Sequence, residues 1–216
     1  MERKIIHYKG KDLTVTYERP RCIHAERCVK DLPQVFDPDR KPWVDADATD
    51  AEKLAALIHT CPSGALHYER NDGGDTEPVP TANTVTLGVD GPLWVRGNLE
   101  INGVEGQANE IRAAFCRCGA SKYKPFCDGS HDKLPFKDSG KGKPGNIDES
   151  LSSGQLKINP VIDGPVMING PVEIYGADGE LLLRGERAAL CRCGASANKP
   201  FCDGSHMGIG FKSDSN

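Results

Sequence analysis

The sequence contains few aromatic residues, no long hydrophobic run and no excess of positive charge. Phe, Trp and Tyr make up only 6% of its 216 residues, whereas Gly and Pro are frequent at 24 and 15. Such a composition favours short strands and turns over long helices. No apolar stretch approaches the roughly 18 residues of a membrane span, so we expect no membrane segment. The formal net charge is −4, and nucleic-acid binding requires a basic patch, so we expect no nucleic-acid partner.

The first residues, MERKIIHYKGKD, lack the apolar core of a secretory signal and the composition of a transit peptide. We therefore expect a cytoplasmic protein in a reducing compartment, where thiols stay free to bind metals. The nine cysteines are odd in number, which does not suit a framework of disulfide pairs. They form three groups of three, which indicates metal ligands: Cys22, Cys28 and Cys61; Cys116, Cys118 and Cys127; Cys191, Cys193 and Cys202.

Residues 1–72 are predicted to form an α+β domain. Residues 4–19 contain two β-rich runs around a Lys-Gly-Lys turn, which predicts a hairpin. Residues 49–60 show helical spacing of apolar residues, with Thr49 or Asp50 as the N-cap. The stretch CPSGALHY then leads into a short strand. Residues 71–82 have the composition of a linker.

The rest of the chain is an internal repeat. One copy covers residues 83–137 and the other covers residues 155–213, with residues 138–154 as a second predicted linker. Each copy reads as short strands, a glycine turn, further strands and a cysteine loop. One copy has too little apolar surface for a stable core. We therefore predict two β-rich units that share a core as an intramolecular pseudo-two-fold pair, in a chain that is α+β in class.

The two copies end in nearly the same sixteen residues, CRCGASKYKPFCDGSH and CRCGASANKPFCDGSH. Small residues after the second cysteine allow the backbone to approach a metal group. Asp128 is predicted to cap a helix that carries His131. Arg117, Lys122 and Lys124 are positioned in the sequence to compensate the thiolates. Three thiolates and one imidazole can hold zinc or a [2Fe–2S] cluster, and the Cys-x-Cys spacing favours iron slightly.

Both copies resemble the signature of the CDGSH iron–sulfur family, the mitoNEET-like proteins, in its tandem two-motif type. The resemblance implies a redox-active [2Fe–2S] cluster in each copy, held by three cysteines and one histidine. The implied ligands are Cys116, Cys118, Cys127 and His131 for the first cluster, and Cys191, Cys193, Cys202 and His206 for the second.

A histidine ligand has physical consequences of its own. Imidazole in place of a thiolate makes the site less negative, which favours reduction. Protonation of the ring removes its ligand lone pair. We therefore hypothesise that reduction is coupled to proton uptake at His131 and His206, and that acid releases the clusters.

The N-terminal cysteines lie in CIHAERC and TCPSGAL, which resemble the divergent mono-cluster ferredoxins. The resemblance implies that Cys22, Cys28 and Cys61 hold a [3Fe–4S] or [4Fe–4S] cluster. Ala25 occupies the position of a fourth ligand and cannot bind iron, while His24 is its neighbour. The alternative is an apo domain with three free buried cysteines.

The sequence therefore predicts an iron–sulfur protein that acts in electron transfer, not an enzyme. Two alternatives remain: storage or transfer of acid-labile, histidine-ligated clusters, and a zinc-stabilised interaction module. The expected partner is a redox protein or an apo-protein that accepts a cluster. We expect a monomer with an internal pseudo-dimer.

Overall fold

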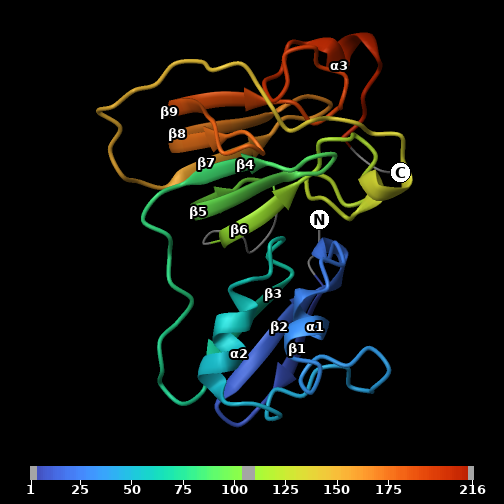
Figure 1. Cartoon of the computed structure of the whole chain (residues 1–216), viewed down its shortest axis with the longest axis vertical. Coiled ribbons are helices and arrows are strands. Elements are labelled where there is room, and N and C mark those ends of the chain that lie inside the picture. Colours follow the sequence, from blue (N-terminus) through green and yellow to red (C-terminus); the bar gives the residue numbers. More distant parts are fainter. Residues whose placement is uncertain (1–3, 104–109, 214–216) are drawn as a thin grey trace. The chain divides into compact units, whose positions relative to one another are not determined.

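A computed structural model describes residues 4–103 and 110–213 of the chain. These residues form two compact units, one up to Pro78 and one from Val79 onward. Figure 1 shows both units as strands with a few short helices, which agrees with the predicted α+β class. None of the described helices has the length and apolar character needed to cross a membrane.

The N-terminal unit combines three strands with three short helices. In chain order these are β1 (Ile5–Lys9), β2 (Leu13–Glu18), the 3-10 helix η1 (Arg19–Arg21), α1 (Arg27–Asp31), α2 (Ala51–Ile58) and β3 (Leu66–Arg70). The strands form an antiparallel sheet in the order β1-β2-β3. The predicted hairpin is confirmed, because β1 pairs with β2 and places His7 opposite Thr16. The predicted strand after the third cysteine is β3, which pairs with the other edge of β2.

Helix α2 forms where the sequence predicts it. The carboxylate of Asp50 accepts a hydrogen bond from the amide of Lys53 at 2.9 Å, which makes Asp50 the N-cap. Leu54 and Ile58, one turn apart, are fully buried in one core with Val15 of β2. Burial of each such side chain contributes about 2 kcal/mol to stability. The packing of α2 therefore fixes the position of Cys61, which follows this helix closely.

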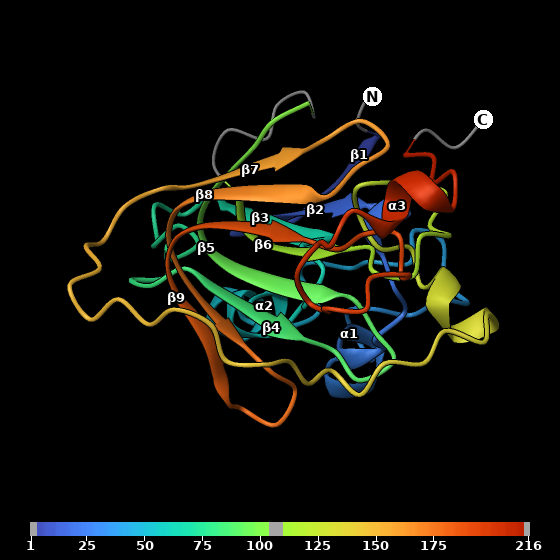
Figure 2. The same cartoon turned by 90° about the horizontal axis from the view of Figure 1, so that it is seen from above.

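The described residues of the second unit form six strands and two short helices. In chain order these are β4 (Thr84–Leu87), β5 (Leu93–Ile101), β6 (Glu110–Phe115), η2 (Ser130–Lys133), β7 (Leu156–Pro160), β8 (Val166–Tyr175), β9 (Leu181–Leu190) and α3 (Ser205–Gly208). Buried and more exposed residues alternate along β5, as expected for a strand with one face on a core. Figure 2 shows these strands from above, with β7 beside β8 and β5 beside β4.

The two repeats exchange strand pairings. The first strand of each repeat pairs in parallel with the middle strand of the other, β4 with β8 and β7 with β5. The registers correspond: Thr84 lies opposite Glu173, and the equivalent residue Lys157 lies opposite Glu100. Together with the antiparallel pairs within each repeat, these contacts close a ring of four strands.

One hydrophobic core serves both repeats. It includes Val85 and Leu93 from the first repeat and Ile158 and Ile174 from the second, all almost completely buried. Each repeat therefore covers apolar surface that the other would expose to water. This shared core is what the low apolar content of one copy predicts.

Of the two predicted linkers, one has no regular secondary structure and the other pairs with a strand. Residues 71–82 contain no helix or strand. Residues 138–154 do not form a free connection, because this segment pairs with β9. The amide of Gly145 donates to the carbonyl of Leu182 at 2.6 Å, and Ile147 forms a bridge with Arg184. The segment covers backbone groups of a strand that would otherwise remain an exposed edge, a constraint that composition does not reveal.

Candidate metal centres

Each cysteine loop begins at the end of a buried strand and returns to it. In the first repeat the amide of Cys116 donates to the carbonyl of Pro125 at 3.0 Å, and the amide of Cys127 donates to a carbonyl of β6 at 2.8 Å. Cys191 and Cys202 make the same two bonds at 2.8 Å in the second repeat. Two candidate ligands of each site are thus fixed to one strand end.

The four candidate donors of each loop form two close pairs. In the first loop the Sγ atoms of Cys116 and Cys118 are 3.7 Å apart, and Sγ of Cys127 is 3.3 Å from Nδ1 of His131. The second loop repeats this arrangement, with 3.7 Å between Cys191 and Cys193 and 3.4 Å between Cys202 and Nδ1 of His206. The structure therefore places the four predicted residues of each loop in two pairs, one of two thiols and one of a thiol with an imidazole.

This donor set fits an iron–sulfur cluster. Thiolates and a neutral imidazole are ligands that iron in such clusters accepts. The imidazole presents Nδ1 to the site, which leaves Nε2 on the outer side of the ring. Over residues 4–103 and 110–213, no three Cys, His, Asp or Glu side chains converge as ligands of a single metal ion.

Asp128 organises the end of the first loop, although it is not the helix cap that the sequence suggests. Its carboxylate accepts hydrogen bonds from the amides of Lys122 at 2.9 Å and Ser130 at 3.0 Å. Burial acts to raise the pKa of Asp128, but a hydrogen bond from the side chain of Ser130 and the bonds from these two amides hold it below the ordinary value. The cap of η2 is Gly129, whose φ of 81° lies in the region that favours glycine. His131 then lies in the first turn of η2.

The side chain of Arg117 supports the loop from behind, and its bonds do not go to the cysteines. It is buried and donates to the carbonyls of Gly91 at 2.8 Å and Gly88 at 2.5 Å. It also forms an ion pair with Asp138 at 2.8 Å. The expectation that Arg117 compensates the thiolates directly is therefore replaced by a structural role.

The thiols of the first loop affect one another's pKa. The Sγ atoms of Cys116 and Cys118 share a hydrogen bond, which lowers the pKa of Cys116 and raises that of Cys118. The charge of Lys124 contributes to the lower pKa of Cys116. Burial raises the pKa of Cys127 to about 12. Because thiolates are the metal-binding form, loading of the site must release protons.

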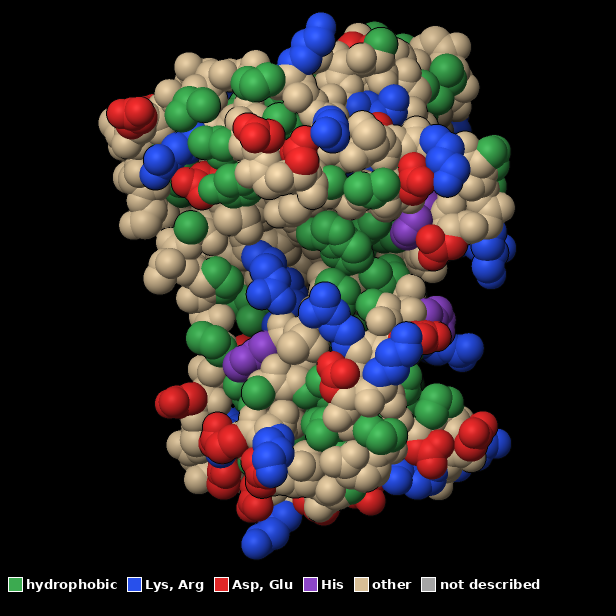
Figure 3. Space-filling model, viewed as in Figure 1, with side chains coloured by type: hydrophobic (Ala, Val, Ile, Leu, Met, Phe, Trp, Pro, Cys, Tyr) green, Lys and Arg blue, Asp and Glu red, His purple; other side chains and the backbone are tan. Residues whose placement is uncertain are grey.

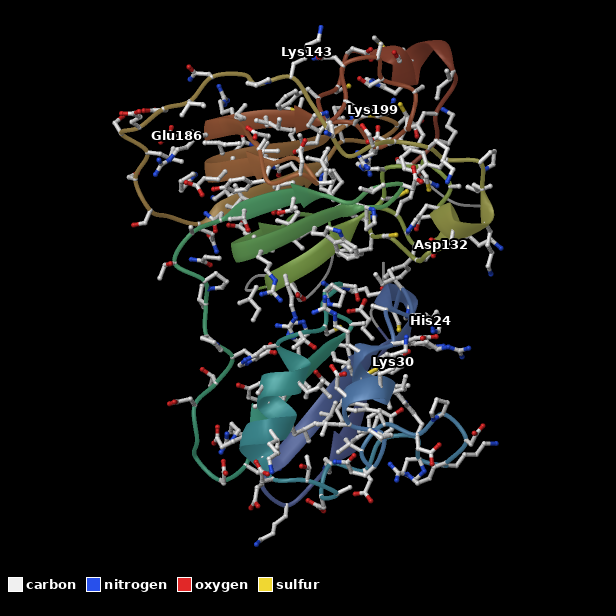
Figure 4. All side chains as sticks on the ribbon, viewed as in Figure 1. His24, Lys30, Asp132, Lys143, Glu186 and Lys199 are labelled. Atoms are coloured by element: carbon white, nitrogen blue, oxygen red, sulfur yellow. The ribbon has the colours of Figure 1, made fainter. Side chains whose placement is uncertain are left out.

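The three N-terminal cysteines line one cavity of about 680 Å³. Cys22 follows η1, Cys28 lies in α1 and Cys61 comes shortly after α2, so three separate elements supply them. His24 and Ala25 line the same cavity. Figure 4 labels His24 on the loop that precedes α1. Three soft thiol donors around one cavity fit an iron–sulfur cluster.

The walls of this cavity carry more positive than negative charge. Arg19, Arg27, Arg40 and Lys41 line it, and Glu26 is the acidic residue among its described lining. Figure 3 shows Lys and Arg side chains gathered around the loop before α1. A cluster with thiolate ligands carries negative charge, so these cations favour its binding.

A buried arginine connects two of the segments that carry cysteines. Arg21 is fully buried, donates to the carbonyl of Ser63 at 3.0 Å and lies 3.7 Å from the carboxylate of Glu18. Arg21 precedes Cys22, and Ser63 follows Cys61 closely, so this bond fixes both cysteines relative to each other. Burial raises the pKa of the third thiol, Cys28, to about 11.

Sequence reasoning missed Arg21, Tyr17 and Asp138. The position of Arg21 next to Cys22 could have pointed to it. The burial of its side chain, however, depends on the fold and cannot be predicted from the sequence. Tyr17 lines the cavity, and burial followed by the nearby Cys22 raises its pKa. Asp138 pairs with Arg117 although the two are 21 residues apart in the chain, and no sequence pattern marks that pair.

Comparison with known proteins assigns both parts of the chain. Residues 8–71 match the model of a family described as divergent 4Fe-4S mono-cluster, and residues 90–132 and 163–207 match the family described as iron-binding zinc finger CDGSH type. The uncharacterized protein YjdI of Escherichia coli K12 is 38% identical over 61 residues, which are 28% of this chain and 80% of YjdI. YjdI of Escherichia coli O157:H7 gives the same values. No solved structure matches the chain.

Proposed function

Because the chain belongs to the divergent 4Fe-4S mono-cluster family through its N-terminal unit and to the CDGSH iron–sulfur family through its repeats, we propose that it is a three-cluster electron-transfer protein. The observation that carries this proposal is the repeated arrangement of donors. Both cysteine loops hold two thiols in one pair, and a thiol with an imidazole in the other.

Two pairs of donors suit a [2Fe–2S] cluster, in which each iron takes two protein ligands. In the first repeat, Cys116 and Cys118 would hold one iron, while Cys127 and Nδ1 of His131 would hold the other. The second repeat would use Cys191, Cys193, Cys202 and His206 in the same roles. When bound, such a cluster supplies a centre that accepts and releases one electron.

The protein residues around each proposed cluster hold it and adjust its charge. A neutral imidazole in place of a thiolate makes the site less negative and raises its reduction potential. Nε2 of His131 lies 3.4 Å from the carboxylate of Asp132. The equivalent position in the second repeat is Met207, which carries no charge. We therefore expect different reduction potentials at the two sites.

The N-terminal cavity would hold the third cluster. Cys22, Cys28 and Cys61 supply three thiolates, which is enough for a [3Fe–4S] cluster or for three irons of a [4Fe–4S] cluster. The cations around the cavity support an anionic group there.

We also infer that the two repeats are related by a pseudo-two-fold axis. The reciprocal pairing of β4 with β8 and of β7 with β5 supports this relation. A pseudo-two-fold axis would make the two cluster sites equivalent and place both on one shared core. We propose a cytoplasmic monomer that exchanges electrons with a redox partner and performs no catalysis of its own.

Transfer of whole clusters is the second candidate function. It is favoured by the position of His131, whose side chain is 12% exposed, while the thiols of Cys116 and Cys127 are buried and that of Cys118 is partly buried. A ligand at the surface edge of a cluster is the one that an acceptor protein can displace. The acceptor would be an apo-protein with free thiols.

Metal and sulfide analysis combined with EPR tests the proposal. We expect iron with acid-labile sulfide in protein purified without air, and two reducible [2Fe–2S] signals after dithionite, with a third signal from the N-terminal unit. Zinc without sulfide would contradict the proposal and support the alternative of a zinc-stabilised interaction module. Incubation with an apo-ferredoxin separates the two functions, because an electron carrier keeps its clusters and a cluster donor loses them.

A further inference from the structure

The N-terminal cavity has one donor fewer than a complete [4Fe–4S] cluster needs. Each of the four irons in such a cluster takes a ligand outside the cluster, and four cysteines commonly supply them. Here Cys22, Cys28 and Cys61 provide three. Ala25 also lines the cavity, but its methyl group cannot coordinate iron.

Most other polar residues that line the cavity have hydrogen-bond partners. The hydroxyl of Tyr8 accepts a bond from Nε1 of Trp43 at 2.7 Å, and that of Thr60 donates to the carbonyl of Leu57 at 2.7 Å. Ser63 contacts Cys61, with 3.8 Å between Oγ and Sγ. These hydroxyl groups already interact with protein atoms and are therefore poor candidates for a metal ligand.

The charged residues of the cavity are also poor ligands. The carboxylate of Glu26 pairs with Lys30 at 2.8 Å on the same helix end. The arginines and the lysine of the lining are protonated cations, which repel iron. His24 is exposed and makes no hydrogen bond or ion pair with any residue that the structure describes, although its charge acts on Glu26. Its imidazole is also a donor that iron accepts readily.

The backbone around His24 has an uncommon conformation. His24 has φ of 55° and Glu26 has φ of 59°, both in the left-handed region, although neither residue is glycine. Such residues persist where the surrounding structure requires them, and they concentrate at functional sites. The two left-handed residues curl the loop between Cys22 and Cys28, so that His24 lines the same cavity as the cysteines.

We propose that His24 is the fourth protein ligand of the N-terminal cluster, which is then a [4Fe–4S] cluster with three cysteines and one histidine. This inference rests on the proposed function, since it requires a cluster in the N-terminal cavity. It assigns all three clusters of the chain the same ligand composition. It also makes this cluster less negative than one held by four thiolates, which raises its reduction potential.

Three variants of the full-length protein, purified without air, test the proposal. His24→Ala removes the ligand, and His24→Cys replaces it with a thiolate. His7→Ala is the control, because His7 is an exposed histidine of β1 that does not line the cavity. Iron and sulfide are counted per chain, and EPR spectra are recorded before and after mild oxidation with ferricyanide.

The wild type and His7→Ala should contain about eight irons per chain, the content of two [2Fe–2S] clusters and one [4Fe–4S] cluster, and should keep them after oxidation. His24→Ala should lose about one iron on oxidation and show the EPR signal of a [3Fe–4S] cluster. His24→Cys should keep the fourth iron and show a lower potential. The [2Fe–2S] signals report within each sample that the chain is folded.

Two contrary results are distinguishable. If His24→Ala keeps its fourth iron as the wild type does, His24 is not the ligand, although the N-terminal cluster exists. If the wild type contains only the iron of two [2Fe–2S] clusters, the N-terminal cluster itself is absent, and both this inference and that part of the proposed function are wrong.

Discussion

A Cβ atom placed on Gly119 would lie 2.9 Å from the carbonyl oxygen of Cys193. The contact has a counterpart, because a Cβ on Gly194 would lie 3.2 Å from the carbonyl oxygen of Arg117. The two cysteine loops, one from each repeat, therefore meet through their backbones at the residues next to their ligands. Both glycines have φ of 81°, so each is required by conformation as well as by space.

We predict that Gly119→Ala weakens the contact between the cysteine loops. The left-handed conformation costs about 1 kcal/mol for alanine, and the clash with the Cys193 carbonyl adds about 2 kcal/mol. Chemical unfolding of the holo-protein measures the loss. Gly179→Ala is the matched control, because Gly179 has φ of 84° and a Cβ atom placed on it would meet nothing within 4 Å. Equal losses in the two variants would mean that the loop contact is not tight.

We predict that His131→Cys lowers the reduction potential of the first CDGSH site. A thiolate adds a negative charge that the neutral imidazole does not carry, so the shift should be on the order of 100 mV. Potentiometric titration followed by EPR measures it, and His206→Cys provides the equivalent change at the second site. A potential that stays the same in both variants would contradict the proposed role of the histidines as ligands.

We predict that Asp138→Asn destabilises the first repeat. The side chains of Arg117 and Asp138 are 1% and 9% exposed and lie 2.8 Å apart, so the substitution leaves a buried cation without its carboxylate. Loss of one partner in such a pair costs about 3 kcal/mol. Thermal unfolding detected by circular dichroism and by loss of cluster absorbance would measure this change.

The control for Asp138→Asn is Asp178→Asn, which removes an exposed partner of Lys141. An exposed ion pair contributes at most about 1 kcal/mol. The second repeat has Ser213 at the position of Asp138. The substitution should therefore affect the first site and spare the second, and equal loss of both clusters would contradict a local role.

We predict a pH-dependent effect for Asp163→Asn. Asp163 accepts hydrogen bonds from Lys212 at 2.7 Å and from the amide of Ser213 at 2.8 Å, and these lower its pKa. The stabilisation is present above the pKa of an unfolded Asp, about 3.9, and is lost as the pH falls through the lower folded value. The melting temperature of the variant should be below that of the wild type at neutral pH.

The difference in melting temperature caused by Asp163→Asn should shrink below a pH of about 4. Melting curves of both proteins at a series of pH values provide the measurement. Asp90 makes the equivalent contacts to Lys137 and Asp138 in the first repeat, so Asp90→Asn should behave alike. A difference that stays constant at acidic pH would show that the carboxylate charge is not the cause.

Much of the local structure could be predicted from the sequence, because it depends on interactions between near neighbours. The hairpin of β1 and β2 follows from β-rich runs around a glycine turn, and α2 follows from Asp50 and its apolar spacing. The repeated cysteine loops were recognisable for the same reason. Their four donors lie within sixteen residues, so their spacing already limits how far apart they can be.

The helix cap at the first site shows the limit of local rules. Asp128 has the side chain of a good N-cap, but Gly129 takes the position because the chain must turn through a left-handed conformation there. The linker at residues 138–154 shows another limit. Its polar composition predicts a free segment, whereas the open edge of β9 binds it.

By itself, the sequence determined the repeat, the ligand types and the two families, because these depend on residue identity and spacing. Only the tertiary structure decided which distant residues meet. It closed the strands of both repeats around one core, brought Gly119 against Cys193, and placed Arg21 between the segments of Cys22 and Cys61. It also gathered Cys22, Cys28, Cys61 and His24 around one cavity. These contacts depend on burial and on strand pairing between remote segments, and no local pattern in the chain records either of them.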